Sequence, residues 1–487
     1  MNMSKRISRI VPLLATVGLF AAGVLVTNFF GTSAQRATVA GGASRNAAIV
    51  AATAQILRET SDLRELAILR PVKSGAQSRA EIERMLVKKL DEQTTQEEMH
   101  ATELTLRKFG LVSEEFEYRP FIIKLLTEQV AGYYDARARE FYLADWLELE
   151  GQKPVIAHEL THALQDQHFN LRRFERWPDG DADAELAAHA LIEGDATLAM
   201  TLYMARNPLV ALAFSRSLSG MTAASKQFNE SPRALRDTLI FPYFQGMEWA
   251  TELYKRGGWK MVSGAYAKLP QSSEQIMHPE KYFAYEAPVK VALPDLTDVL
   301  NESSKQQTAI SNQQSANGSQ THAKRPRRAK ATRRPSMTSP TPGTRNPTPS
   351  RWRRIEYDVN GEWSYYLILD QFLNAATESK RAAAGWAGDR YAVYERPQSG
   401  QLLLVQASEW DTQNDAEEFF NAYVKRTALR YPNAELLADS QNPTPETVRR
   451  WQTAEGGVIV ELRGARVLVL EGIPAGVDAN VLMRAIG

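Results

Sequence analysis

Apolar residues recur every three or four positions along two stretches near the start of the chain, residues 46–70 and 78–110. This spacing places the apolar side chains on one face of a helix. The second stretch begins with Ser78 and has Glu81 three residues later, which is a capping-box pattern, and it ends at Gly110. We therefore expect amphipathic helices over both stretches.

The pattern then shortens into two strand-like segments before it becomes helical again. Residues 130–135 and 140–143 are rich in apolar and aromatic residues on either side of a turn, which predicts two short strands. The strand at 140–143 offers an edge to which an extended peptide could add. Pro154 is expected to open a long helix, and a second long helix is expected over 181–204.

Composition changes abruptly over residues 303–350, where polar residues, proline and basic residues dominate. Such a segment buries too little apolar surface to offset its ordering entropy, so we expect a disordered linker. The basic run KRPRRAKATRR, residues 324–334, is expected to be solvated. Contact with a polyanion or a cell surface is the alternative role for this run.

The pattern after residue 351 predicts a smaller unit that mixes helices and strands. Helices are expected over 361–376 and 415–430, and strands over the segments 391–394, 401–407, 458–462 and 466–470. We therefore predict an α+β fold in two parts: a mostly helical domain with a short strand element at 35–302, and a C-terminal α+β domain with an antiparallel sheet at 351–487.

The first 34 residues have the pattern of an export signal. Three basic residues, Lys5, Arg6 and Arg9, precede the apolar run 10–26, and small residues at 32–34 provide a cleavage point. The apolar run of about 17 residues is at the lower limit for a membrane span, so a retained N-terminal anchor is the alternative to a cleaved signal. Both interpretations predict that the rest of the chain is exported: secreted, periplasmic or attached to the envelope.

Net charge and cysteine content limit the partners and the metal ligands that the chain can have. The formal net charge of +1 gives no whole-protein reason to expect a nucleic-acid partner. The chain has no cysteine, which excludes disulfides, a thiol nucleophile and thiolate metal ligands. Any metal ion must therefore be held by nitrogen and oxygen atoms.

The segment VIAHELTHALQDQHF, residues 155–169, contains three of the seven histidines. His158 and His162 are four residues apart, so on a helix their imidazoles lie one turn apart on the same face and can bind one Zn²⁺ ion. Glu159 lies beside that face, where its carboxylate can act as general base for metal-bound water. This is the HExxH pattern of zinc hydrolases.

Catalytic zinc takes a third protein ligand, and the residues leave several candidates. His168, six residues after His162, has the spacing of the metzincin peptidases, but Gln165 occupies the position where those enzymes have a helix-breaking glycine. The next predicted helix offers three residues spaced four apart on one face, Glu185, His189 and Glu193. We favour Glu193, because Gly194 and nearby alanines would allow two helices to approach closely.

The segment AHELTHA, residues 157–163, resembles the zinc helix of the gluzincin-type metallopeptidases, whose third ligand is a glutamate on a following helix. The segment EGDA at 193–196 resembles the element that supplies this glutamate. The wider pattern, from GYYD at 132–135 to SSEQIMHPEKY at 272–282, is similar to a bacterial family of exported, poorly characterised metallopeptidase-like proteins. The resemblance implies a zincin-like catalytic domain with Zn²⁺ on His158, His162 and Glu193.

Further site residues and functions follow as expectations. Asp195 or His189 could orient a ligand histidine, and the candidate donors to a reaction intermediate are His278, Tyr133, Tyr134 and Tyr282. The leading function is hydrolysis of peptide or protein substrates. The alternatives are a zinc amidase acting on cell wall and a non-catalytic envelope binding protein with a structural zinc site. The helical residues 36–120 are either a propeptide or part of the catalytic fold.

Overall fold

The computed structural model describes residues 18–19 and 42–487, except residues 176, 178–179, 223–227, 229, 304–350 and 438–446. Most of the predicted export signal and nearly all of the predicted linker, with its basic run, therefore lie outside the described residues. Among the residues that are described, no helix is long and apolar enough to cross a membrane.

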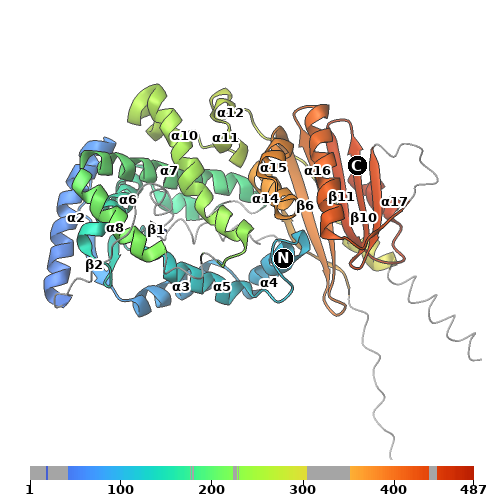
Figure 1. The fold of residues 1–487 in the computed structure, drawn as a ribbon, viewed down its shortest axis with the longest axis horizontal. Coiled ribbons are helices and arrows are strands. Elements are labelled where there is room, and N and C mark those ends of the chain that lie inside the picture. The colour runs from blue at the N-terminus through green and yellow to red at the C-terminus, as the bar shows by residue number, and fades with distance from the viewer. Residues whose placement is uncertain are drawn as a thin grey trace, which may run out of the picture.

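The fold is α+β, as predicted, with a mainly helical part followed by a part built on an antiparallel sheet (Figure 1). The elements of the first part are β1 (Gly18–Leu19), α2 (Gly42–Arg64), β2 (Lys73–Gln77), α3 (Arg79–Gln93), α4 (Gln96–Phe109), α5 (Tyr118–Gln129), β3 (Val130–Asp135), β4 (Glu140–Ala144), α6 (Leu149–Phe169), the 3-10 helix η2 (Leu171–Glu175), α7 (Ala182–Arg206), α8 (Pro208–Thr222), α10 (Arg233–Ala265), α11 (Ser273–Met277) and α12 (Pro279–Ala284).

The elements of the second part, which we call the C-terminal unit (residues 351–487), are β5 (Arg353–Asp358), α14 (Gly361–Leu373), α15 (Ala376–Ala383), β6 (Trp386–Arg396), β7 (Gln401–Trp410), α16 (Gln413–Arg430), β8 (Glu435–Leu436), β9 (Val448–Thr453), β10 (Gly456–Arg463), β11 (Arg466–Ile473) and α17 (Ala479–Ile486). The four predicted strands lie within β6, β7, β10 and β11, whereas β5, β8 and β9 were not predicted.

Several predicted helix boundaries were wrong. The helix predicted over 46–70 ends at Arg64, and the helix predicted over 361–376 ends at Leu373. The stretch 78–110 forms two helices, because Thr95 and Glu98 build a second capping box that starts α4. In that box the Thr95 N–H donates to Glu98 Oε2 at 2.6 Å. Pro154 lies inside α6, which already begins at Leu149. Proline has a helical φ, but it lacks the N–H and its ring crowds the carbonyl four residues earlier. Pro154 lies close to the start of α6, and the helix continues past it.

The seven-stranded sheet has the order β5-β6-β7-β11-β10-β9-β8, and every neighbouring pair is antiparallel. Alternate residues of its strands point to opposite faces. On one face, residues such as Val393 and Val469 pack with α14 and α16. On the other, residues such as Leu468 pack with α17 and with the segment 291–300, which precedes the linker.

The small sheet beside α6 has the order β1-β3-β4-β2. Strand β4 pairs on one side with β3 and on the other with β2, which runs parallel to it. The expectation that residues 140–143 offer a free edge to a peptide was therefore wrong. Strand β2 was not predicted, and it satisfies the backbone groups of β4 that would form this edge.

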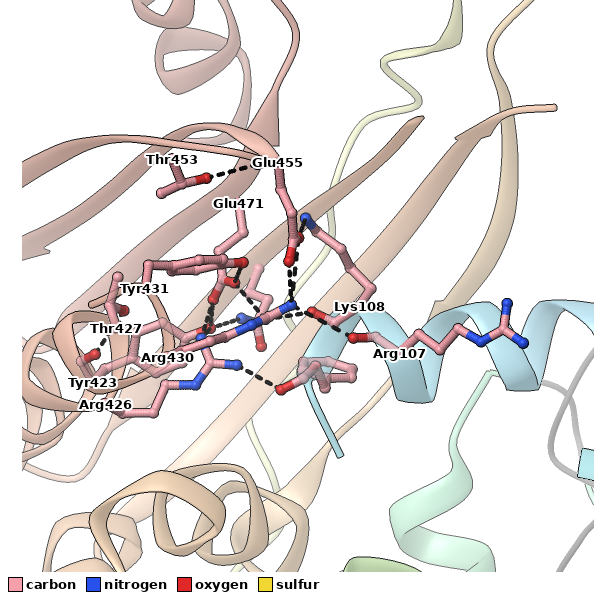
Figure 2. A network of polar contacts seen from close by, with 12 residues as sticks. Arg107, Lys108, Tyr423, Arg426, Thr427, Arg430, Tyr431, Thr453, Glu455 and Glu471 are labelled. Atoms are coloured by element: carbon pink, nitrogen blue, oxygen red, sulfur yellow. Dashed lines mark hydrogen bonds and ion pairs between the residues drawn. The ribbon is translucent and has the colours of Figure 1, made fainter. Parts of the chain in front are cut away.

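The two parts of the chain share one hydrophobic cluster, which includes residues of α6, α7 and α10 together with residues of α14, α16 and the large sheet. A buried polar network adds to this contact at the end of α4 (Figure 2). Arg426 and Arg430 of α16 donate to the carbonyl oxygens of Phe109 and Lys108, both at 2.6 Å. Cations stabilise the carbonyl end of a helix, so these contacts tie α4 to the C-terminal unit.

Glu471 of β11 balances the charge of this network. Its carboxylate lies 2.5 Å from Arg426 and 2.9 Å from Arg430, and it also accepts a hydrogen bond from the hydroxyl of Tyr423. Burial alone would raise the pKa of Glu471, but the two arginines lower it to about 2. The network is therefore charged and internally paired at neutral pH.

Candidate metal centre

Helix α6 carries His158, Glu159 and His162 into the protein interior, where each residue is at most 5% exposed. One ligand atom from each of these residues lies within 4.8 Å of the other two. The two histidine Nε2 atoms are 3.1 Å apart, as expected for residues one helical turn apart that face the same point. The HExxH segment thus forms a buried cluster of nitrogen and oxygen atoms.

Helix α7 adds Glu193 to this cluster. Glu193 Oε2 lies 3.1 Å from His158 Nε2 and 3.4 Å from His162 Nε2. Atoms bound at 2.0–2.1 Å to one tetrahedral zinc ion are about 3.3–3.4 Å apart. The three separations of 3.1, 3.1 and 3.4 Å lie close to that spacing. These residues therefore fit a zinc ion with three protein ligands.

The position of Glu193 depends on close packing of α7 against α10. A Cβ atom at Gly194 would lie 2.1 Å from the backbone of Gly246, and one at Gly246 would lie 2.1 Å from the carbonyl of Ala190. Both glycines are thus required by the contact between these helices. Gly194 was expected to allow contact with the HExxH helix; it faces α10 instead.

Glu159 is held by the neighbouring strand β3. Its Oε2 accepts a hydrogen bond from the backbone N–H of Tyr134 at 2.8 Å. Its Oε1 is buried and has no hydrogen-bond partner among the described residues. Burial raises the pKa of Glu159 to about 8, although His162 opposes this shift. One carboxylate oxygen is therefore anchored and the other is free for chemistry.

The charges of the three candidate ligands are coupled. Burial would raise the pKa of Glu193, but His162 and His158 lower it to about 2. Burial lowers the pKa of His158, whereas for His162 the adjacent Glu193 outweighs burial and raises the pKa to about 9. The anionic Glu193 thus stabilises a positive charge in the cluster, which either a proton or a metal ion can provide.

Gln165 determines which nitrogen of His162 faces the cluster. Gln165 Nε2 donates to Asp195 Oδ2 and to the carbonyl of Ile192, both at 3.0 Å. Its Oε1 must therefore be the acceptor for His162 Nδ1, 2.8 Å away. The proton of a neutral His162 is thus held on Nδ1, and Nε2 is left with a lone pair for a metal ion.

Asp195 is the centre of the contacts behind Gln165. It forms an ion pair with Arg64 of α2, with Nε–Oδ1 at 2.5 Å and Nη2–Oδ2 at 3.0 Å, and both side chains are fully buried. The hydroxyl of Tyr266 donates to Asp195 Oδ2 at 2.9 Å. Asp195 was expected to orient a ligand histidine, and the structure connects it to His162 through Gln165.

His158 is oriented in a different way. Its ring stacks on Tyr243 of α10 at a centroid distance of 6.0 Å. Its Nδ1 is buried and has no hydrogen-bond partner among the described residues. The position of this ring therefore depends on packing against α10.

The remaining predicted site residues make other contacts. His168 Nε2 lies 2.7 Å from the carbonyl of Ala67, and His278 Nε2 lies 2.9 Å from Glu362. The hydroxyls of Tyr133, Tyr134 and Tyr282 donate to Gln77, Asp166 and the Lys268 carbonyl, respectively. Glu185 lies two turns before Glu193 on α7. The assignment of a donor to these hydroxyls or to His278 stays a prediction.

His189, one turn before Glu193, is buried, and neither ring nitrogen has a hydrogen-bond partner in the described part of the chain. Burial lowers its pKa to about 4, so the imidazole is neutral at neutral pH. The orienting role predicted for either His189 or Asp195 stays a prediction: Gln165, and not Asp195, contacts His162, and Asp195 contacts Gln165. The contacts of Gln165, Arg64 and Tyr266 behind His162 were not predicted. Only Gln165 could have been found from the sequence, because it lies three residues after His162 on the same helix.

Comparison with known proteins adds one finding. Residues 350–482 match the model of a family described as Domain of unknown function (DUF8575). This match covers the C-terminal unit and does not include the candidate metal centre. No curated protein and no solved structure matches the chain.

We expect the Gln165→Leu substitution to lower the zinc affinity by roughly 10- to 100-fold, the usual loss when a partner of a ligand histidine is removed. The substitution leaves His162 Nδ1 and Asp195 Oδ2 without the contacts of the Gln165 amide. Competition titration with a chromophoric chelator measures the affinity. Gln167→Leu, on the same helix but bonded to Leu69 and Arg70, is the matched control. Equal affinities in the two variants would contradict the role of Gln165.

Proposed function

We propose that the protein is an exported zinc-dependent peptide hydrolase, in which His158, His162 and Glu193 hold Zn²⁺ and Glu159 is the general base. The observation that carries this proposal is the set of separations between the three ligand atoms, 3.1, 3.1 and 3.4 Å. The HExxH pattern and its resemblance to gluzincin-type metallopeptidases support it from the sequence.

Bound zinc would supply Lewis acidity, which makes a water molecule acidic at neutral pH and polarises a substrate carbonyl. Glu159 would serve as the general base through Oε1, the oxygen without a partner among the described residues, while the Tyr134 N–H keeps Oε2 in place.

Glu159 also favours hydrolysis over a structural zinc site. A structural site needs four ligands and has no use for a buried carboxylate that is held by a strand and has one free oxygen. Burying such a group with one oxygen unpaired costs free energy, a cost that a purely structural site does not require. The same zinc chemistry serves amide bonds in proteins and in cell wall, so the substrate must be tested directly.

The test is digestion of casein and of isolated cell wall in parallel, by the purified full chain, with and without a metal chelator. We expect cleavage of casein that stops with the chelator and returns when zinc is added. Cleavage of cell wall alone would favour the amidase, and absence of cleavage of both substrates by the zinc-loaded protein would contradict an enzymatic function.

A further inference from the structure

A cavity of about 200 Å³ lies where helices α4, α5, α7 and α10 meet the C-terminal unit. Apolar side chains form most of its wall, for example Leu106 of α4, Ile122 of α5, Leu239 of α10 and Leu367 of α14. None of the four residues of the candidate metal centre lines it. The C-terminal unit, whose family match gives no function, supplies a substantial part of the wall.

Polar groups also line the cavity. Glu185 of α7 and Asp358 and Asn360 of the C-terminal unit are among the lining residues. Asp358 is fully buried; its Oδ1 accepts hydrogen bonds from the Ala182 and Val359 N–H groups, each at 2.8 Å. Its Oδ2 has no partner among the described residues. A buried acceptor without a partner is costly, so a ligand that donates a hydrogen bond here would be favoured.

Two helices connect this cavity with the candidate metal centre. Glu185 lines the cavity and Glu193 lies on the same face of α7, eight residues or about 12 Å further along the helix. On α10, Leu239 lines the cavity, and Tyr243, one turn later, stacks on His158. A distance of about 12 Å corresponds to about three residues of extended peptide.

Size and charge restrict what the cavity can hold. An apolar cavity of about 150 Å³ accommodates benzene, and sites for whole drug-sized ligands measure about 300–1,000 Å³. The volume of about 200 Å³ therefore suits one large apolar side chain. Asp358 Oδ2, which has no partner among the described residues, can accept a hydrogen bond from a peptide N–H.

We propose that this cavity binds a large apolar side chain of the substrate peptide, about three residues from the bond that is cleaved. The inference rests on the proposed function and adds the substrate class, peptides with an aromatic or long aliphatic residue at one fixed distance. It also gives the C-terminal unit a role: its residues Asp358, Leu367 and Tyr391 complete the pocket that selects this residue.

The experiment uses the zinc-loaded full chain with Glu159→Gln, which prevents cleavage, and ten-residue alanine–glycine peptides in which one phenylalanine is moved along the sequence. Calorimetry is expected to show binding that is roughly tenfold to a hundredfold tighter when phenylalanine is at one position, the gain from burying one phenyl group. The wild-type chain, given the same peptides, is expected to show the same preference in kcat/KM, with cleavage about three residues away.

Two variants of α10 test whether the cavity is the cause of the preference for phenylalanine. Thr238 lines the cavity and Thr251 does not, so Thr238→Phe is expected to fill the pocket and remove the preference, while Thr251→Phe keeps it. Thermal melting and zinc content establish that each variant is folded. If Thr238→Phe fails to fold, Leu367→Ala replaces it and is expected to shift the preference from phenylalanine to tryptophan.

Each outcome decides the inference. A preference that survives Thr238→Phe or is unchanged in Leu367→Ala, or cleavage of all peptides at equal rates, would overturn the cavity assignment while the proposed hydrolysis stands. Binding of decanoate that Thr238→Phe abolishes, without a phenylalanine preference, would assign the cavity to acyl chains and overturn the inference. Absence of hydrolysis by zinc-loaded wild-type protein overturns the proposed function and this inference together.

Discussion

The Glu159→Gln variant is expected to lose peptide hydrolysis, with kcat lower by about 10²–10⁴-fold and with zinc still bound in a one-to-one ratio. In the wild-type protein the Tyr134 N–H donates a hydrogen bond to Glu159 Oε2. Glutamine has the same shape, and its amide oxygen can accept the same hydrogen bond. The amide cannot take a proton from water. Steady-state kinetics on a peptide substrate, together with elemental analysis for zinc, measure both parts of the prediction.

The thermal stability of Glu159→Gln shows whether the loss of activity comes from the missing base or from unfolding. The pKa of Glu159 in the folded protein, about 8, is above its ordinary value of 4.5, so its ionisation opposes folding as pH rises through this interval. The uncharged variant without metal should therefore melt at least as high as the wild-type chain at neutral pH. Glu150→Gln, on the same helix but exposed, is the control expected to keep full activity. Full activity of Glu159→Gln would contradict the mechanism.

Glu193→Gln is expected to weaken zinc binding by more than the roughly 10- to 100-fold that loss of an orienting partner costs, because it removes a ligand. The substitution removes the carboxylate charge 3.1 Å from His158 and 3.4 Å from His162. It should also lower the pKa of His162, which the charge of Glu193 raises. Chelator competition gives the zinc affinity, and NMR titration of the metal-free protein gives the histidine pKa.

Two substitutions serve as controls for Glu193→Gln. Glu185→Gln makes the same change on the same buried helix, about 12 Å from Glu193, and is expected to leave zinc binding intact. His168→Ala is expected to do the same, because His168 contacts the Ala67 carbonyl on another segment. Loss of zinc in His168→Ala alone would show that the third ligand was assigned incorrectly.

The HExxH cluster could be predicted from the sequence because its residues lie within one turn of a single helix. Two histidines four residues apart on a helix converge whatever else the protein does, and Glu159 follows from the same helix. Glu193 was chosen from a sequence pattern of small residues, and the contact distances support the choice. The packing reason differed from the expectation, because Gly194 serves the contact with α10.

The contacts behind the cluster could not be predicted. Arg64 and Asp195 are 131 residues apart in the chain, and Tyr266 and Asp195 are 71 apart. No periodicity or spacing rule joins residues over such separations. Arg64 lies in the region that was expected to be either a propeptide or part of the catalytic fold. Its fully buried ion pair with Asp195 places α2 directly behind the cluster.

By itself, the sequence determined the α+β class, the main helices, four strands of the large sheet and the three residues of HExxH, because helical and strand periodicity act over neighbouring residues. Only the tertiary structure decided that β4 has no free edge, that Gln165 holds His162, and that the C-terminal unit closes a cavity near the centre. These features depend on which buried polar and apolar surfaces meet. Packing of distant segments decides that, and no local pattern records it.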